Sequence, residues 1–230
     1  MTIKHWTIYR ILIMTVSGVF LFGCMASTPT AISTPAFTPL PEQMDKSPFT
    51  GVPCAAPCWQ GLEVGKSSES EVTSVLSTLT FINQDSIQIF RRSSMPDYYV
   101  KDFGPGIEID ANCINPRTEC LVLTTANDVL QKIKVRLNYE ISADEAIRYL
   151  GAPDYMGYND FSSERIVCEV YLAWSKGRLV LVTTFEDLAG AQKYCYVAGR
   201  EGKVPANMPI LEARYLSDVE FKAYLFVSKP

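Results

Sequence analysis

The chain has 230 residues, of which 47% are hydrophobic and 20% are charged, and its formal net charge is −4 at neutral pH. These values are typical of a globular protein of one or two domains, and they exclude a disordered or collagen-like chain. Because there is no basic excess, the composition argues against nucleic acid as a partner. The chain has one histidine, His5, and seven cysteines.

Residues 1–23 have the pattern of a signal peptide. Lys4 and Arg10 give a positive start, and an apolar run follows over residues 11–22. This run is shorter than the roughly 20 residues that a membrane-spanning helix needs. It leads into Leu21-Phe22-Gly23-Cys24, which resembles the lipobox of bacterial lipoproteins. The alternatives are a plain secretory signal and an N-terminal anchor helix.

The lipobox resemblance implies a role for Cys24. In bacterial lipoproteins the signal peptide is removed just before the lipobox cysteine, which carries a diacylglyceryl group and often an N-linked acyl chain such as palmitate. By this resemblance Cys24 is the lipidated first residue of a mature protein that is anchored to the cell membrane and faces outside the cytoplasm. The next residue is Met25 and not the aspartate associated with inner-membrane retention, so the outer membrane is a further location if the source has two membranes.

Residues 24–47 are rich in Ser, Thr and Pro and have no periodic apolar pattern. Such a composition favours an extended, solvated chain. We therefore expect a tether that holds the folded region, residues 48–230, away from the membrane.

Removal of the signal peptide takes away the only histidine of the chain, His5. The sequence therefore predicts no catalytic residue of the Ser-His-Asp or Cys-His type, no histidine-ligated metal and no cofactor. Lys4 and Arg10 are lost as well, whereas no acidic residue is lost, so the net charge falls from −4 to −6. The acidic mature chain argues further against a nucleic-acid partner.

Six cysteines remain besides Cys24, and an even number in an exported chain predicts disulfide bonds. Closeness along the chain favours three pairs, Cys54 with Cys58, Cys113 with Cys120, and Cys168 with Cys195, and we expect the last pair to join two strands. The alternatives are a four-thiolate metal site, which an exported location disfavours, and a redox pair. The three residues between Cys54 and Cys58, where redox motifs have two, disfavour the latter.

Two short amphipathic helices are predicted from one recurring pattern. Ser68-Glu69-Ser70-Glu71 and Ser142-Ala143-Asp144-Glu145 are both capping-box sequences. After each box, apolar residues recur at helical spacing, namely Val72, Val75, Leu76 and Leu79 in the first segment and Ala143, Ala146, Ile147 and Leu150 in the second. Gly151-Ala152-Pro153 then ends the second helix.

Segments typical of strands follow each helix. They cover residues 86–92, 98–103, 106–110, 119–125 and 129–137 in the first part, and 167–174, 178–184, 194–198 and 219–227 in the second. Asn127-Asp128 is placed for a hairpin turn, and Ser175-Lys176-Gly177 for a second turn in which the glycine has a positive φ. We expect an α+β fold that is mostly β, with two similar helix-plus-antiparallel-sheet halves over residues 48–137 and 138–230.

Two further sequence motifs resemble those of known families. Pro57-Cys58-Trp59-Gln60-Gly61 resembles the start of exported bacterial lipoproteins that have no assigned activity. A capped helix that ends in Leu150-Gly151-Ala152-Pro153 before a strand meander is similar, more distantly, to the β-lactamase inhibitory protein fold and to small outer-membrane assembly lipoproteins. The second resemblance implies a tandem α+β architecture used for binding, and no catalytic residues are carried over with it.

The candidate site is a segment with three aromatic residues and a methionine that we expect to be a loop, namely Tyr155, Met156, Tyr158 and Phe161. Exposed aromatic side chains are typical of recognition surfaces; packing into the core is the alternative, as we expect for Trp59 and Trp174. The sequence therefore predicts a non-catalytic binding or envelope-structural module whose partner is a protein or an envelope component. The alternative is an envelope hydrolase that uses carboxylates, from the pairs Glu108 with Asp110 and Asp154 with Asp160.

Overall fold

The computed structural model describes residues 44–91, 105–114, 118–160 and 168–227. The expected signal peptide, Cys24, most of the expected tether, the expected strand 98–103 and Phe161 lie outside these residues. Among the helices of the described ranges, none is long and apolar enough to cross a membrane.

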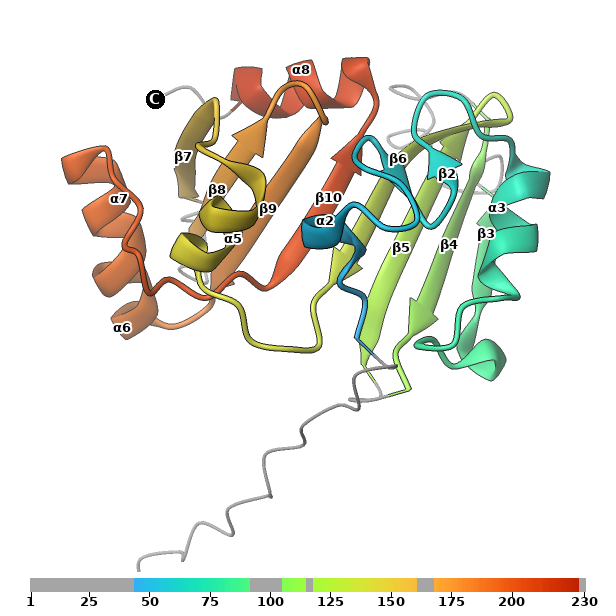
Figure 1. Cartoon of the computed structure of the whole chain (residues 1–230), viewed down its shortest axis with the longest axis horizontal. Coiled ribbons are helices and arrows are strands. Elements are labelled where there is room, and N and C mark those ends of the chain that lie inside the picture. Colours follow the sequence, from blue (N-terminus) through green and yellow to red (C-terminus); the bar gives the residue numbers. More distant parts are fainter. Residues whose placement is uncertain (1–43, 92–104, 115–117, 161–167, 228–230) are drawn as a thin grey trace, which may run out of the picture. The chain divides into compact units, whose positions relative to one another are not determined.

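Short helical segments separate runs of strands along the chain, as Figure 1 shows. The helical segments are α2 (Ser47–Thr50), α3 (Glu69–Leu76), η2 (Gln84–Ser86), α5 (Ala143–Leu150), α6 (Leu188–Gly190), η4 (Ala191–Cys195), α7 (Tyr196–Glu201) and α8 (Asp218–Val227). The strands are β1 (Cys58–Trp59), β2 (Leu62–Glu63), β3 (Gln88–Arg91), β4 (Ile107–Asn112), β5 (Glu119–Ala126), β6 (Val129–Arg136), β7 (Tyr155–Asp160), β8 (Cys168–Trp174), β9 (Leu179–Phe185) and β10 (Glu212–Leu216).

In the described residues, eight strands form one sheet in the order β3-β4-β5-β6-β10-β9-β8-β7, and every neighbouring pair is antiparallel. The four strands after α3 occupy one side of this sheet, and the four strands after α5 occupy the other. Strands β6 and β10, which end the two sets, meet in the middle (Figure 1). The helices and the large antiparallel sheet confirm a mostly β, α+β fold.

Both predicted capping boxes are present. The Ser68 hydroxyl accepts a hydrogen bond from the Glu71 backbone N–H, and the Glu71 carboxylate accepts one from the Ser68 N–H; Ser142 and Glu145 repeat this exchange. Gly151 ends the second helix with a φ of 80°, which an L side chain rarely adopts. These local signals fix where the two helices begin because they satisfy backbone donors that the helix itself leaves unpaired.

The sheet has a large core on one face and a small one on the other. The large core lies against α2, α3, α5, η4 and α7, and it includes Trp59 and Trp174, whose predicted burial is confirmed. On the opposite face, Phe221 of α8 packs with Tyr171, Val180 and other residues of β8, β9 and β10. The second face is therefore apolar where α8 lies over it.

The three predicted disulfide pairs are confirmed by their geometry. The Cα–Cα distances are 5.6 Å for Cys54–Cys58, 5.4 Å for Cys113–Cys120 and 6.4 Å for Cys168–Cys195. The last pair, however, joins β8 to the helical segment η4 and does not join two strands. The apolar sequence around Cys195 favours a strand by composition, but its backbone continues the helical run from α6 into α7.

Three other expectations about local structure are wrong. Residues 219–227 form helix α8, because Ser217 caps it through the Glu220 N–H and because Phe221, Tyr224 and Leu225 lie on one helical face. Residues 155–160 form strand β7, and β10 lies in a segment for which we expected no strand. Strand β7 forms by pairing with the next strand, β8, whereas β10 forms by pairing with β6 and β9, which lie far along the chain.

The turn after β8 differs in one detail from the turn that the sequence predicts. The positive φ falls on Arg178, at 47°, and not on Gly177. Gly177 is needed for another reason, because a Cβ atom there would lie 2.9 Å from the Cβ atom of Ala56. The turn therefore packs directly on the loop between Cys54 and Cys58.

Candidate functional site

Strand β7 lies at one edge of the sheet and exposes large side chains. Tyr155 is 49% exposed, Met156 46% and Tyr158 37%. Among the described residues β7 pairs only with β8, so no other strand of these residues pairs with its outer edge. The predicted recognition segment is thus an edge strand and not a loop.

The three exposed side chains of β7 divide between the two faces of the sheet. Tyr155 pairs with Ala173, which belongs to the core under α8, whereas Met156 and Tyr158 pair with Leu172 and Val170 of the large core. Gly157 between them pairs with Tyr171, and a Cβ atom at this position would collide with the Tyr171 ring. The glycine therefore marks a close packing position within a strand, whereas by sequence alone it resembles a loop signal.

Helix α7 lies beside β7 on the outer side of the sheet (Figure 1). Its residue Tyr196 is 63% exposed, and the Arg200 guanidinium carbon lies 5.9 Å from the centre of the Tyr196 ring. Helix and edge strand together thus present exposed aromatic side chains at one end of the sheet. Sequence reasoning missed Tyr196, because the composition of residues 194–198 is typical of a strand.

Of the two carboxylate pairs expected from the sequence, only Glu108 with Asp110 comes together. Both project from the same face of β4, and burial raises the pKa of Asp110, with further contributions from Glu108 and Glu119 that Lys134 opposes. Asp154 lies before β7 and accepts hydrogen bonds from Ser175, which lower its pKa.

Asp154 is separated from Asp160 by the length of an extended strand, about 20 Å at roughly 3.3 Å per residue. The side chain of Asp160 lies outside the described part of the structure. The backbone therefore does not bring the second pair together.

Two buried side-chain atoms on β4 and β5 have no hydrogen-bond partner within the described part of the structure. One is Oδ1 of Asp110, and the other is the hydroxyl oxygen of Thr124, whose residue is only 1% exposed. Thr124 is the cross-strand partner of Glu108 on one side and of Lys132 on the other. Sequence reasoning missed Thr124, because only the strand register places it beside the carboxylates.

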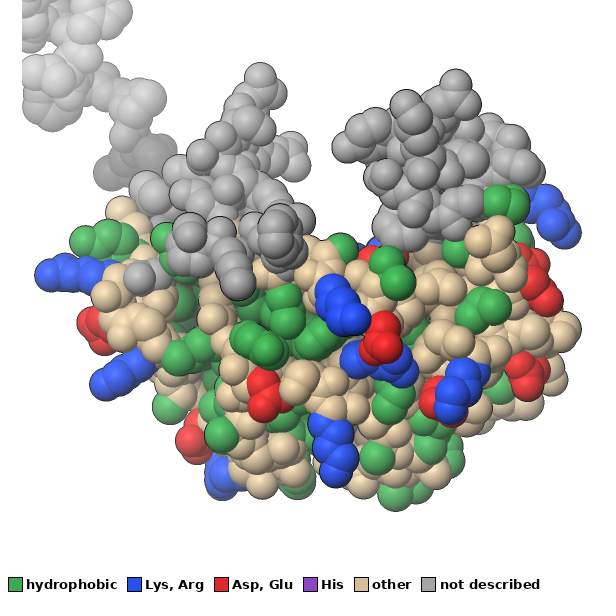
Figure 2. Space-filling view, turned by 90° about the horizontal axis from the view of Figure 1, so that it is seen from above, with side chains coloured by type: hydrophobic (Ala, Val, Ile, Leu, Met, Phe, Trp, Pro, Cys, Tyr) green, Lys and Arg blue, Asp and Glu red, His purple; other side chains and the backbone are tan. Residues whose placement is uncertain are grey.

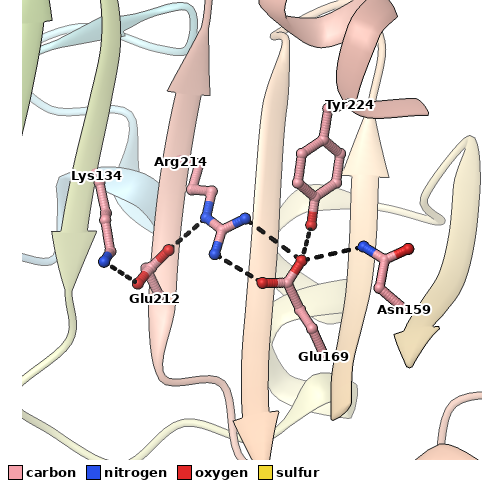
Figure 3. A network of polar contacts seen from close by, with 6 residues as sticks. All are labelled: Lys134, Asn159, Glu169, Glu212, Arg214 and Tyr224. Atoms are coloured by element: carbon pink, nitrogen blue, oxygen red, sulfur yellow. Dashed lines mark hydrogen bonds and ion pairs between the residues drawn. The ribbon is translucent and has the colours of Figure 1, made fainter. Parts of the chain in front are cut away.

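A network of charged and polar side chains connects α8 to the sheet (Figure 3). Arg214 of β10 binds Glu169 of β8 and also its neighbour Glu212, which in turn pairs with Lys134 of β6. Tyr224 of α8 donates its hydroxyl to Glu169, and Asn159 of β7 also donates to Glu169. Two cations and two anions neutralise one another, so this network has no charge left over for a ligand.

A second buried polar cluster surrounds Asp45, at the end of the predicted tether. Its carboxylate accepts hydrogen bonds from the indole N–H of Trp59 at 2.6 Å and from the Gln60 amide and the Ser47 N–H, both at 3.0 Å. The Tyr139 hydroxyl donates to the Asp45 carbonyl at 2.8 Å. Because Asp45 is buried, the folded region begins before residue 48, where the sequence predicts its start.

No metal centre stands out in the described residues, and charges of both signs are mixed on the face that Figure 2 shows. No group of three or more His, Cys, Asp or Glu side chains in these ranges could hold a metal ion. On the described part of the face that Figure 2 shows, acidic and basic side chains lie next to one another and between apolar ones.

Comparison of the chain with protein-family models, with curated proteins and with solved structures finds no match. Its function must therefore be inferred from its own residues.

Proposed function

We propose that this chain is a membrane-anchored extracytoplasmic lipoprotein, lipidated at Cys24, whose folded region is a non-catalytic binding module. The lipobox-like sequence and the Ser/Thr/Pro-rich residues 24–47 support the anchor and the tether. The three disulfides are consistent with an oxidising compartment outside the cytoplasm. The partner is a protein of the cell envelope.

One observation carries the binding role, namely that β7 is the edge strand of the sheet in the described residues and exposes Tyr155, Met156 and Tyr158. A partner strand can add to such an edge through main-chain hydrogen bonds, while side chains on both faces provide specificity. Natural edge strands are commonly protected by charges, prolines or bulges. Strand β7 instead presents two tyrosines and a methionine, which are side chains typical of interfaces.

We further propose that residues 48–137 and 138–230 are two similar halves. The support is the shared order of elements, in which a helix with a Ser-x-x-Glu capping box precedes four sheet strands. The meeting of β6 and β10 at the centre of the sheet is what a pseudo-twofold relation between such halves requires.

Site-specific photo-crosslinking in intact cells tests the binding role. A photo-reactive phenylalanine at position 155 or 158 is expected to give the same crosslinked protein, because both side chains flank one edge. The same group at Val219, which is 72% exposed on α8, serves as the matched control and is expected to give no such product. Equal products from all three positions, or none from the β7 positions, would contradict the proposal.

A second candidate function is an envelope hydrolase that uses carboxylates. The raised pKa of Asp110 beside Glu108 favours it, because a general acid must hold its proton at the working pH. Release of reducing ends from cell-wall polysaccharide, and its loss in Asp110→Asn and Glu108→Gln, is the outcome expected for this function. Polysaccharide left intact by the wild-type chain would exclude it.

A further inference from the structure

The three disulfides differ in how far solvent reaches them. The cysteines of two pairs are buried, with 2% to 5% of their surface exposed, namely Cys113, Cys120, Cys168 and Cys195. Cys54 and Cys58 are each partly exposed, and Ala55 between them is exposed. A thiolate must reach a disulfide sulfur to attack it, so access decides which bond reacts while the chain stays folded. Of the three disulfides in the described residues, Cys54–Cys58 is the one open to such an attack.

A backbone donor is placed at one of its two sulfurs. The turn between β1 and β2 has positive φ at both of its central residues, 52° at Gln60 and 86° at Gly61. This turn directs the Gly61 N–H at Sγ of Cys54, with 3.4 Å between nitrogen and sulfur. A hydrogen bond to the charged form stabilises a thiolate on Cys54 once the S–S bond breaks. Cys54 is therefore the better leaving group, and Cys58 is the sulfur that an incoming thiolate attacks.

The disulfide also closes a loop that packs on a distant part of the chain. A Cβ atom at Gly177 would lie 2.9 Å from the Cβ atom of Ala56, so the loop rests directly on the turn of residues 175–178. The S–S bond limits the conformations of Ala56 to those of a small closed ring. Opening the bond removes this constraint from the contact with the turn.

We propose that Cys54–Cys58 is a redox site, where a protein dithiol outside the cytoplasm reduces the disulfide and releases the loop from the turn. One thiolate of the dithiol forms a bond to Sγ of Cys58, and the electron pair of the old S–S bond leaves on Cys54. The second thiolate then attacks the dithiol's own sulfur in this mixed disulfide and displaces Cys58. The dithiol is oxidised by two electrons to a disulfide, and its two protons end on Cys54 and Cys58.

The spacing of the two cysteines agrees with this role. The two-residue spacing of redox motifs belongs to proteins that catalyse exchange, whereas here the chain is the substrate of the exchange. The location of the dithiol rests on the proposed export of the chain. The chemistry at Cys58 involves neither Cys24 nor strand β7, so it is tested independently of the proposed function.

The test measures the reduction rate of each disulfide in the full chain in detergent micelles. Free thiols are first blocked with N-ethylmaleimide, dithiothreitol serves as the dithiol probe, and samples quenched with iodoacetamide are mapped by mass spectrometry. Cys54–Cys58 is expected to open at least about tenfold faster than the two buried pairs, which react only when the fold opens locally. In guanidinium chloride that unfolds the chain the three rates should converge, and a difference that persists there would contradict burial as its cause.

Glutathione, a monothiol, tests which sulfur is attacked. After the same quench, glutathione is expected on Cys58 and the alkyl group on Cys54. The reverse distribution would overturn the assignment of Cys54 as the leaving group.

Hydrogen exchange tests the release of the loop. In the reduced and alkylated chain, the amides of residues 54–56 and 175–178 are expected to exchange faster, whereas those of β5 stay unchanged. The double variant Cys54→Ser/Cys58→Ser is the matched control, and it should show the fast exchange without a reductant and no change when dithiothreitol is added. The proposal is overturned if Cys54–Cys58 opens no faster than the buried pairs, or if it opens and leaves exchange in the turn unchanged.

Discussion

Arg214 and Glu169 form an ion pair on the face of the sheet beneath helix α8, with 2.8 Å between Nη2 and Oε2. Their side chains are only 18% and 9% exposed. Tyr224 of α8 adds a hydrogen bond to the same carboxylate. The pair therefore connects β10, β8 and the C-terminal helix through one buried group.

Removal of Glu169 is expected to destabilise the fold. In Glu169→Ala the Arg214 charge stays buried with Glu212 as its remaining partner, and the Tyr224 hydroxyl loses its acceptor. We expect a loss of about 3 kcal/mol in the free energy of unfolding, measured by urea denaturation, because a broken buried pair leaves a charge uncompensated. Asp144→Asn, which removes the exposed pair with Arg148, is the control, with an expected change under about 1 kcal/mol. Similar losses in both variants would contradict this view of the network.

Asp110 is expected to make stability depend on pH in an unusual direction. Its pKa is raised in the folded chain, so folding favours the protonated form, and stability falls as the pH rises from the unfolded pKa, about 3.9, through the folded one. Asp110→Asn should therefore raise the thermal midpoint at pH 7 and have little effect at pH 3, as calorimetry at the two pH values would show. A gain of equal size at both would mean that the charge of Asp110 is not the cause.

The three disulfides are expected to differ in their contribution to stability. Chain-entropy arguments give about 3.6 kcal/mol for Cys168–Cys195, whose cysteines are 27 residues apart, and about 2 kcal/mol for Cys54–Cys58, which are 4 apart. Replacing both cysteines of a pair by serine, with denaturant unfolding as the measurement, tests this order. A larger loss for the short loop would show that packing around it, including the contact of Ala56 with Gly177, outweighs loop entropy.

Cys24 is expected to be the lipidated residue. Metabolic labelling with radioactive palmitate should label the wild-type chain, and Cys24→Ser should abolish both the label and the recovery of the protein in the membrane fraction. Cys54→Ser is the control because it removes a cysteine of the folded region and should retain the label. Label that persists in Cys24→Ser would contradict the lipobox interpretation.

Features of this fold that depend on neighbouring residues could be predicted from the sequence. Helices α3 and α5 begin at Ser-x-x-Glu sequences, and Asn127-Asp128 forms the hairpin between β5 and β6 with both φ values positive. The disulfide pairs followed from closeness along the chain. The same Ser-x-x-Glu signal at Ser217 also marks α8, but the alternating apolar residues after it masked the helical pattern.

The candidate sites could be predicted only in part. The aromatic residues of 155–158 were identified by composition, yet their exposure arises from the position of β7 at the edge of the sheet. Thr124 carries no sequence signal at all, since a threonine in a strand is ordinary, and only the pairing of β4 with β5 places it beside Glu108.

By itself the sequence determined the helix starts, the hairpin turn and the cysteine pairs, because each depends on contacts between residues close along the chain. It also predicts the N-terminal lipoprotein pattern. Only the tertiary structure decided, for the residues that it describes, that β10 lies between β6 and β9, that β7 is an edge strand, and that two polar atoms on neighbouring strands lack partners. These features depend on strand order and register, which are set by packing between residues distant in sequence. The surfaces from which we argue function are therefore products of the fold and not of any local motif.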